Sequence, residues 1–191
     1  MKKIKLIALF GESGAGKDTI LQLICAEDPH LFYRVVTCTT RPKRDGEIEG
    51  VDYYFVSDEE FAAMAYEEKL VEAMEFNGWF YGTPITSLIE DKINVGVFSP
   101  EGIGCLLDTA DEYDITVLPI YVSCLDKVRL IRVLNREEDP DVEEIIRRYQ
   151  TDKTDFSHIF FSYLTVYNDS EPIESNGIVK TIVNYSKDFF D

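Results

Sequence analysis

The chain has 191 residues, of which 45% are hydrophobic, and it carries a formal net charge of −17. This length suits one compact domain, and the composition supplies a hydrophobic core and argues against disorder. The acidity argues against general binding to nucleic acids or anionic membranes, and no apolar run approaches the length that crosses a bilayer. We therefore expect a folded cytoplasmic protein with no nucleic-acid or membrane partner.

The first ten residues combine lysines with an apolar run, as a signal peptide does. A glycine-rich loop follows directly, without a small-residue cleavage site, so we predict a buried strand there instead. The cysteines form no C-x-x-C pair and no metal-ligand spacing, which predicts reduced, buried thiols in a cytosolic protein. These cysteines are Cys25, Cys38, Cys105 and Cys124.

Strand and helix signals alternate through most of the chain, which favours a largely parallel sheet covered by helices. Apolar and β-branched runs predict strands over residues 4–10, 35–36, 53–56, 70–76, 79–81, 95–98, 115–122 and 163–167. Helical periods predict helices over residues 19–26, 57–69 and 142–149, from residue 126 onward, and at the C-terminus. The order predicts an α/β core formed by residues 1–34 and 83–191, with a β-rich insertion at about 35–82.

Local signals mark several element ends. Ser57 with Glu60 predicts a capping box, and Asn77-Gly78 predicts a tight hairpin between two strands. Thr83-Pro84 is typical of a helix start, with an N-cap followed by proline at the first helical position. The polar stretch 135–141 predicts a mobile loop between two arginine-bearing helices.

The arginines are confined to two segments of an otherwise acidic chain. Three lie between residues 34 and 44, and the other five lie between residues 129 and 148. Guanidinium groups suit bidentate contacts with phosphate, so two clusters predict two places where phosphate is held. For the second cluster, surface ion pairs at helical spacing, such as Glu144 with Arg148, are an equally simple interpretation.

The strongest motif is Gly11-Glu12-Ser13-Gly14-Ala15-Gly16-Lys17-Asp18-Thr19, between a predicted strand and a predicted helix. Here glycines turn backbone N–H groups toward phosphate oxygens, and Lys17 is placed to reach the β- and γ-phosphates. Asp18 stands where G-x-x-x-x-G-K-[ST] has a hydroxyl for Mg²⁺. Either Asp18, directly or through water, or Thr19 is therefore predicted to serve the metal. The motif predicts nucleoside triphosphate binding; the alternative is a strand-to-helix turn without a ligand.

A second set of motifs resembles the guanylate kinases. Residues 39–61 match the family's T-T-R-x-x-R-x-G-E-x-x-G-x-D-Y-x-F-V-S-x-x-x-F, and the match continues at Glu72, Phe76 and Tyr81-Gly82-Thr83. With the phosphate loop, this resemblance covers roughly the first half of the chain. Val166-Tyr167-Asn168-Asp169 is similar to the family's I-x-N-D, which implies that Asn168 lies near the adenosine end of ATP.

The resemblance implies an acceptor site for GMP, in which some side chains hold the phosphate and others read the base. They are Arg41, Arg44, Tyr53 and Tyr81 for the phosphate, and Thr37, Glu72 and Thr83 for the base. Guanine offers two adjacent donors, N1–H and the N2 amine, which one carboxylate accepts together, whereas adenine presents a lone pair at N1. Taken singly, each of these residues has a simpler interpretation. Glu72 would be a solvated edge residue, the tyrosines would be core aromatics, and the arginines would belong to an exposed basic loop.

The second half of the chain departs from the family pattern. Arg132, Arg136 and Arg148 stand where the family has lid arginines, but the family's R-G-T-E is altered after Arg136. The family's D-x-D-x-Q-G, whose second aspartate lies near the guanine amine and the metal, reads Phe98-Ser99-Pro100-Glu101-Gly102 here. Both aspartates are missing, which leaves Ser99 as a hydrogen-bond acceptor or Glu101 as a carboxylate in that place.

The sequence thus predicts an α/β P-loop kinase with a GMP-binding insertion and an arginine-bearing lid at about 129–155. The implied reaction transfers the γ-phosphoryl group of MgATP to GMP or dGMP, with Lys17 and the lid arginines as catalytic residues. Two alternatives stay open: a related kinase with another nucleotide or a sugar phosphate as acceptor, and a non-catalytic guanylate-kinase-like binding module.

Overall fold

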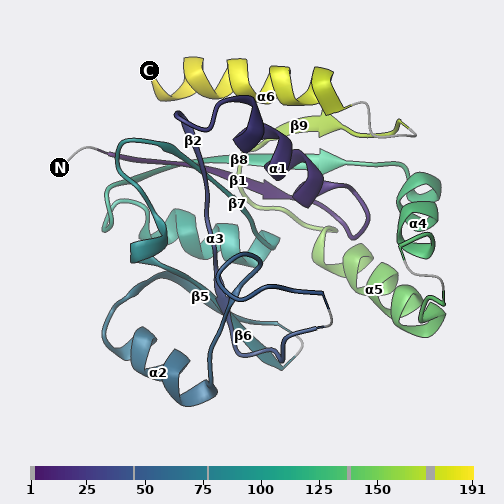
Figure 1. Cartoon of the computed structure of the whole chain (residues 1–191), viewed down its shortest axis with the longest axis horizontal. Coiled ribbons are helices and arrows are strands. Elements are labelled where there is room, and N and C mark those ends of the chain that lie inside the picture. The colour runs from purple at the N-terminus through teal and green to yellow at the C-terminus, as the bar shows by residue number, and fades with distance from the viewer. Residues whose placement is uncertain (1–2, 45, 77, 137–138, 171–174) are drawn as a thin grey trace.

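The computed structural model describes residues 3–44, 46–76, 78–136, 139–170 and 175–191. Its larger sheet consists of five parallel strands (Figure 1). In spatial order they are β2 (Phe32–Arg34), β7 (Ile93–Val97), β1 (Ile4–Phe10), β8 (Ile115–Ser123) and β9 (Leu164–Tyr167). An all-parallel sheet needs cover on both faces, and this one has it.

Helices α1 (Lys17–Glu27) and α6 (Ser175–Phe190) lie together on one face of this sheet, and α3 (Pro100–Thr109) lies on the other (Figure 1). Side chains alternate along the central strand β1, so it contributes to both cores. Ile7 and Leu9 pack with residues of α1 and α6, whereas Leu6 and Phe10 pack with residues of α3. Every one of these four side chains is fully buried.

A smaller four-stranded sheet packs beside α3. In spatial order it contains β4 (Tyr54–Phe55), β3 (Cys38–Thr39), β6 (Trp79–Pro84) and β5 (Leu70–Phe76). Helix α2 (Asp58–Tyr66) covers it through Phe61, which packs with Cys38 and Leu70. Strand β5 joins the sheet to the main body, because Val71 packs among the α3 residues and its carbonyl accepts a hydrogen bond from Thr109 at 2.6 Å.

Helices α4 (Asp126–Leu134) and α5 (Val142–Asp155) follow β8 and lie beyond the carboxyl ends of the parallel strands (Figure 1). The phosphate loop follows β1 at the same end of the sheet, and the start of α3 follows β7 there as well. Ligands of open α/β sheets bind at this end, where loops and helix N-termini converge. No helix among the described residues is long and apolar enough to span a bilayer.

Most predicted elements are confirmed. The predicted buried strand over 4–10 is β1, and the capping box of Ser57 and Glu60 is present with both hydrogen bonds. Strands β5 and β6 form the expected antiparallel hairpin with Phe76 opposite Trp79, although Asn77 of the predicted turn lies outside the described residues. All four cysteines are free, but only Cys38 and Cys124 are buried.

Two predictions of local structure are wrong, and one helix was missed. The strand predicted at 35–36 lies earlier, at Phe32–Arg34, where the chain pairs with β7. Thr83 and Pro84 do not begin an α-helix; they end β6, since Thr83 pairs with Glu72 in the ladder, and only a 3₁₀ turn (Ile85–Ser87) follows. Helix α3 was not predicted, although Ser99 caps it and Pro100 occupies its first turn.

Candidate functional site

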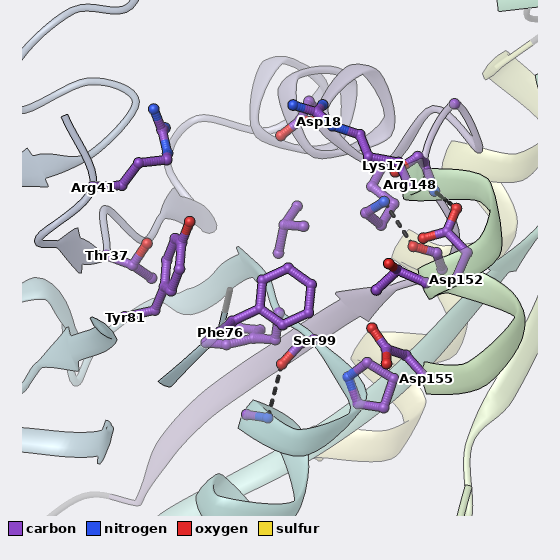
Figure 2. A pocket seen from close by; sticks show the side chains of 18 of the residues that line it. Lys17, Asp18, Thr37, Arg41, Phe76, Tyr81, Ser99, Arg148, Asp152 and Asp155 are labelled. Atoms are coloured by element: carbon purple, nitrogen blue, oxygen red, sulfur yellow. Dashed lines mark hydrogen bonds between the residues drawn. The ribbon is translucent and has the colours of Figure 1, made fainter. Parts of the chain in front are cut away.

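One cavity of about 850 Å³ lies between the phosphate loop, the smaller sheet and α5. Its volume falls in the range of small-molecule sites. Figure 2 shows Arg41, Thr37 and Tyr81 on one side of this cavity and Lys17, Arg148 and Asp152 on the other. Arginines of both clusters therefore face the same space as Lys17 of the phosphate loop.

The phosphate loop has the geometry that its glycines predict. Gly14 adopts φ +81°, and a Cβ there would lie 2.4 Å from the carbonyl oxygen of Arg129, so α4 packs against the loop without room for a side chain. Lys17 Nζ donates to the carbonyl oxygens of Gly11 (2.7 Å) and Glu12 (3.1 Å). Burial lowers the pKa of Lys17, while the neighbouring carboxylates of Asp18 and Asp152 oppose this shift.

The back of the loop is fixed by two residues of the second half. Asn168 Nδ2 donates to the carbonyl oxygen of Ala15 at 2.8 Å. Arg132 Nη2 donates to the carbonyl oxygens of Asn168 (3.0 Å) and Ser170 (2.7 Å). Neither Asn168 nor Arg132 lines the described cavity. The structure therefore places both side chains on the side of the phosphate loop that faces away from the cavity.

Arg41 anchors the wall opposite the phosphate loop. Its guanidinium donates to both carboxylate oxygens of Glu47, at 3.2 and 2.7 Å, and lies 5.5 Å from the ring centroid of Tyr53. The rings of Tyr53 and Tyr81 lie 6.2 Å apart and both line the cavity. Burial raises the pKa of Tyr53 to about 12, which keeps its hydroxyl a neutral donor. Arg44 also lines the cavity and is exposed.

Glu72 is a buried carboxylate in the cavity wall, with 6% of its surface exposed. Its Oε1 accepts a hydrogen bond from the Thr83 hydroxyl at 2.7 Å, and burial raises the pKa of Glu72 to about 7. Thr83 is fully buried and is not among the lining residues, so it contacts Glu72 rather than the cavity. Thr37 does line the cavity.

The start of α3 occupies the place of the missing aspartates. Ser99 caps the helix by accepting from the N–H of Gly102, and its hydroxyl donates to Met74 Sδ at 2.9 Å. A Cβ at Gly102 would lie 3.8 Å from Glu72 Oε2, so the first turn of α3 adjoins the buried carboxylate. Glu101 is exposed and is not a lining residue. Glu101, which the sequence analysis offered as a carboxylate in place of the missing aspartates, therefore does not contribute to the cavity wall.

Two of the three arginines that were predicted to form a lid lie on the cavity wall. Arg136 and Arg148 both line it, and Arg148 Nε donates to Glu144 at 2.7 Å. Glu144 also accepts two hydrogen bonds from Arg147, at 2.6 and 2.9 Å. The predicted ion pairing at helical spacing is thus present. The paired residues Glu144, Arg147 and Arg148 also line the cavity.

Comparison with known proteins places the chain in a family. The guanylate kinase family model matches residues 3–183. The chain belongs to the guanylate kinase family. A guanylate kinase of Synechocystis sp. is 45% identical over 94 residues, 49% of this chain and 48% of that protein. One of Thermosynechococcus vestitus is 48% identical over 86 residues, 45% of this chain and 44% of that protein.

The chain spans about half the length of the curated relatives it matches. A crystal structure of guanylate kinase from Anaplasma phagocytophilum, at 23% identity, matches with a TM-score of 0.67 over 98% of this chain and 87% of that chain. At this identity the likeness shows the fold, which is the P-loop kinase fold with its parallel core sheet.

The family implies an ATP-dependent kinase, so we tested whether this guanylate kinase family member offers oxygen ligands for Mg²⁺. No group of three or more His, Cys, Asp or Glu among the described residues forms a metal cage. Mg²⁺ does not need one, since it keeps several waters and takes one or two carboxylates together with substrate phosphates. Asp18 is exposed and lines the cavity, whereas Thr19 is exposed and does not. The residues therefore fit the ion, through Asp18.

In this guanylate kinase family member, sequence reasoning named Arg129 only as a member of the second arginine cluster and missed Asp152. Arg129 and Asp152 both line the cavity and are buried, with 1% and 9% of their surfaces exposed. Asp152 Oδ2 accepts from the N–H of Ser13 and from Arg129 Nη1, each at 3.0 Å. The available signal was the placement of Arg129 three residues after Asp126 on a helix, but the link to α5 arises only in three dimensions.

Proposed function

We propose that the protein is a guanylate kinase in activity as well as in family, transferring the γ-phosphoryl group of MgATP to GMP or dGMP. The observation that carries this proposal is one cavity that is lined by the phosphate loop, by the buried carboxylate of Glu72 and by Arg41. The net charge of −17 supports small-molecule substrates over nucleic acid or anionic membranes, and we propose a cytoplasmic location.

The acceptor half supports guanine. The buried Glu72 carboxylate lines the cavity, and its Oε1 accepts a hydrogen bond from Thr83. We propose that guanine donates N1–H and the N2 amine to this carboxylate, and that Thr37 contributes a hydroxyl to the base. Adenine would place an acceptor against the carboxylate, and a buried unpaired acceptor discriminates strongly. Thr83 then acts through Glu72, by fixing its orientation.

The phosphate contacts follow from the same walls. We propose that Arg41, Arg44, Tyr53 and Tyr81 hold the GMP phosphate. The amides of Gly11 to Gly16, with Lys17, hold the ATP phosphates, while Asn168 keeps the loop in shape through Ala15. Arg136 and Arg148 approach the transferring group. Arg132 supports them from behind, through its bonds to the chain after β9.

The proposed chemistry is an in-line displacement. An oxygen of the GMP phosphate forms a bond to the γ-phosphorus as the bond to the bridging oxygen of ADP breaks. The acceptor oxygen is already ionised at neutral pH, so the site needs no general base, and catalysis consists of alignment and charge neutralisation. Mg²⁺, held by Asp18 and the phosphates, would supply additional neutralising charge.

The organisation into parts is likewise a proposal. Residues 38–84 contain all four strands of the smaller sheet, which supports a GMP-binding insertion at about 35–82 in a core formed by 1–34 and 83–191. Arg136 follows the end of α4 and Arg148 lies on α5, and both line the cavity, which supports a lid at about 129–155. Closure of two such parts excludes water and suppresses hydrolysis of ATP.

The deciding experiment measures ADP release from MgATP across a panel of acceptors that includes GMP, dGMP, AMP, IMP and a sugar phosphate. We expect release that depends on GMP or dGMP. Release with a different acceptor only would identify a related kinase. Binding of nucleotides without acceptor-dependent release would identify a non-catalytic binding module.

The raised pKa of Glu72 predicts a pH-dependent acceptor site. The carboxyl has a pKa of about 7 in the free protein, and only its ionised form accepts from both guanine donors. As pH falls below 7, kcat/KM for GMP at saturating MgATP should decrease, approaching about tenfold per pH unit. Glu72→Gln is the control, because the GMP phosphate still titrates in that assay while the carboxyl at position 72 is gone. An equal pH dependence in both proteins would contradict the assignment.

A further inference from the structure

Arg129 is the largest fully buried side chain of the described residues, and it lies at the wall of the ATP half of the cavity. Its guanidinium stacks 4.5 Å above the ring of Tyr149. Nε donates to Asp126 at 2.9 Å, and Nη1 donates to Asp152 at 3.0 Å. These contacts hold the guanidinium beside the phosphate loop.

One nitrogen of this guanidinium is left over. Nη2 is buried and has no hydrogen-bond partner among the described residues. A buried donor without an acceptor is costly, and more so when it belongs to a charged group. The phosphate loop is adjacent, because Arg129 Nη1 lies 3.4 Å from the carbonyl oxygen of Ser13 and the Arg129 backbone packs against Gly14.

Asp152 occupies a position that suits a phosphate oxygen. It presents an anionic oxygen to a backbone N–H of the phosphate loop and to a guanidinium at the same time. These are the two kinds of donor that bind phosphates in proteins. Burial raises the pKa of Asp152, while the Ser13 N–H and the charge of Arg129 oppose this shift.

We propose that Arg129 is a further phosphate-contacting residue for the nucleoside triphosphate, and that the Asp152 carboxylate occupies its place until the nucleotide binds. This inference rests on the proposed function, because it takes a triphosphate as the ligand. On binding, a phosphate oxygen replaces the carboxylate at the Ser13 N–H and at Arg129. The guanidinium, including Nη2, then turns its donors to the phosphate, and the like charge of Asp152 moves away from it.

The two residues should therefore respond in opposite directions. Asp152→Asn removes a negative charge that competes with the phosphate, so it should bind a non-hydrolysable imido analogue of ATP about tenfold more tightly or better. Arg129→Lys keeps a positive charge but loses the planar set of donors, so it should bind the same analogue about tenfold more weakly. Tenfold corresponds to about 1.4 kcal/mol, and juxtaposed like charges at a binding site cost at least as much.

The matched control is Asp155→Asn, which removes the same charge one turn later on α5. Asp155 also lines the cavity (Figure 2) but makes no hydrogen bond to the phosphate loop among the described contacts. Calorimetry with the imido analogue, and separately with GMP, measures each affinity, and thermal unfolding measures each fold. We expect Asp155→Asn to change the affinity for the analogue by less than about twofold, and GMP binding to change little in any variant.

Tighter binding in Asp152→Asn with weaker binding in Arg129→Lys supports the inference. Unchanged or weaker binding in Asp152→Asn would overturn it, as would equal tightening in Asp155→Asn, which would reveal a general charge effect. Should Arg129→Lys fail to fold, Asp152→Asn decides alone. Failure of the unmodified protein to bind the analogue would instead contradict the proposed function.

Discussion

Lys17→Ala is expected to lower the turnover of MgATP with GMP by roughly three orders of magnitude, the scale of losing one transition-state charge in phosphoryl transfer. Lys17 is the lysine of the phosphate loop and lines the cavity. Its Nζ donates to the carbonyl oxygens of Gly11 and Glu12, which holds the ammonium group at the phosphate loop.

The measurement is the rate of ADP release at saturating GMP, with Lys180→Ala as the control. Lys180 is an exposed residue of α6, and it does not line the cavity. Its replacement should leave the rate within about twofold of the parent. A Lys17→Ala protein that folds and retains near-normal turnover would show that this loop does not hold the triphosphate.

Glu72→Gln is expected to lower kcat/KM for GMP by about one to two powers of ten, since a hydrogen bond to a charged group contributes about 1.5–3 kcal/mol. The glutamine amide either places a donor against a guanine donor or loses the charge-assisted pair. The fold should tolerate the change, because the Thr83 hydroxyl can still donate to the glutamine Oε1 in one rotamer of the glutamine side chain.

The loss should fall on GMP and leave the KM for ATP unchanged. IMP, which lacks the N2 amine, should be a poorer substrate of the parent and should suffer less from the substitution. Glu75→Gln is the matched control, because Glu75 lies on the same strand but is exposed and does not line the cavity. Equal use of GMP by parent and Glu72→Gln would mean that another group reads the base.

The core of the fold was predictable because its signals are local. The buried run of β1, the capping box of α2 and the hairpin of β5 and β6 each follow from a few consecutive residues. Helix α3 was missed because Gly102 and Gly104 weaken its helical propensity, although Ser99-Pro100 is a valid start. Thr83-Pro84 misled because the pairing of Thr83 with Glu72 overrides the local preference for a helix.

The candidate site divides in the same way. Glu72, Arg41 and the phosphate loop were found because motifs mark them, and the structure brings them around one cavity. Thr83, Asn168 and Arg132 were predicted to contact ligands. In the structure Thr83 donates to Glu72, and Asn168 and Arg132 donate to carbonyl oxygens of the phosphate loop. Arg129 and Asp152 lie 23 residues apart on two helices, and no sequence pattern connects them. Their relation depends on how α4 and α5 pack.

The bidentate contact between Arg41 and Glu47 has a consequence for competition by simple anions. A carboxylate tethered six residues away competes at an effective concentration in the millimolar range or above, whatever the bulk salt. Inorganic phosphate or sulfate brings only its charge to that exchange, whereas a nucleotide also brings base contacts. We therefore expect small oxyanions to compete only weakly against GMP, which an inhibition series with sulfate would measure.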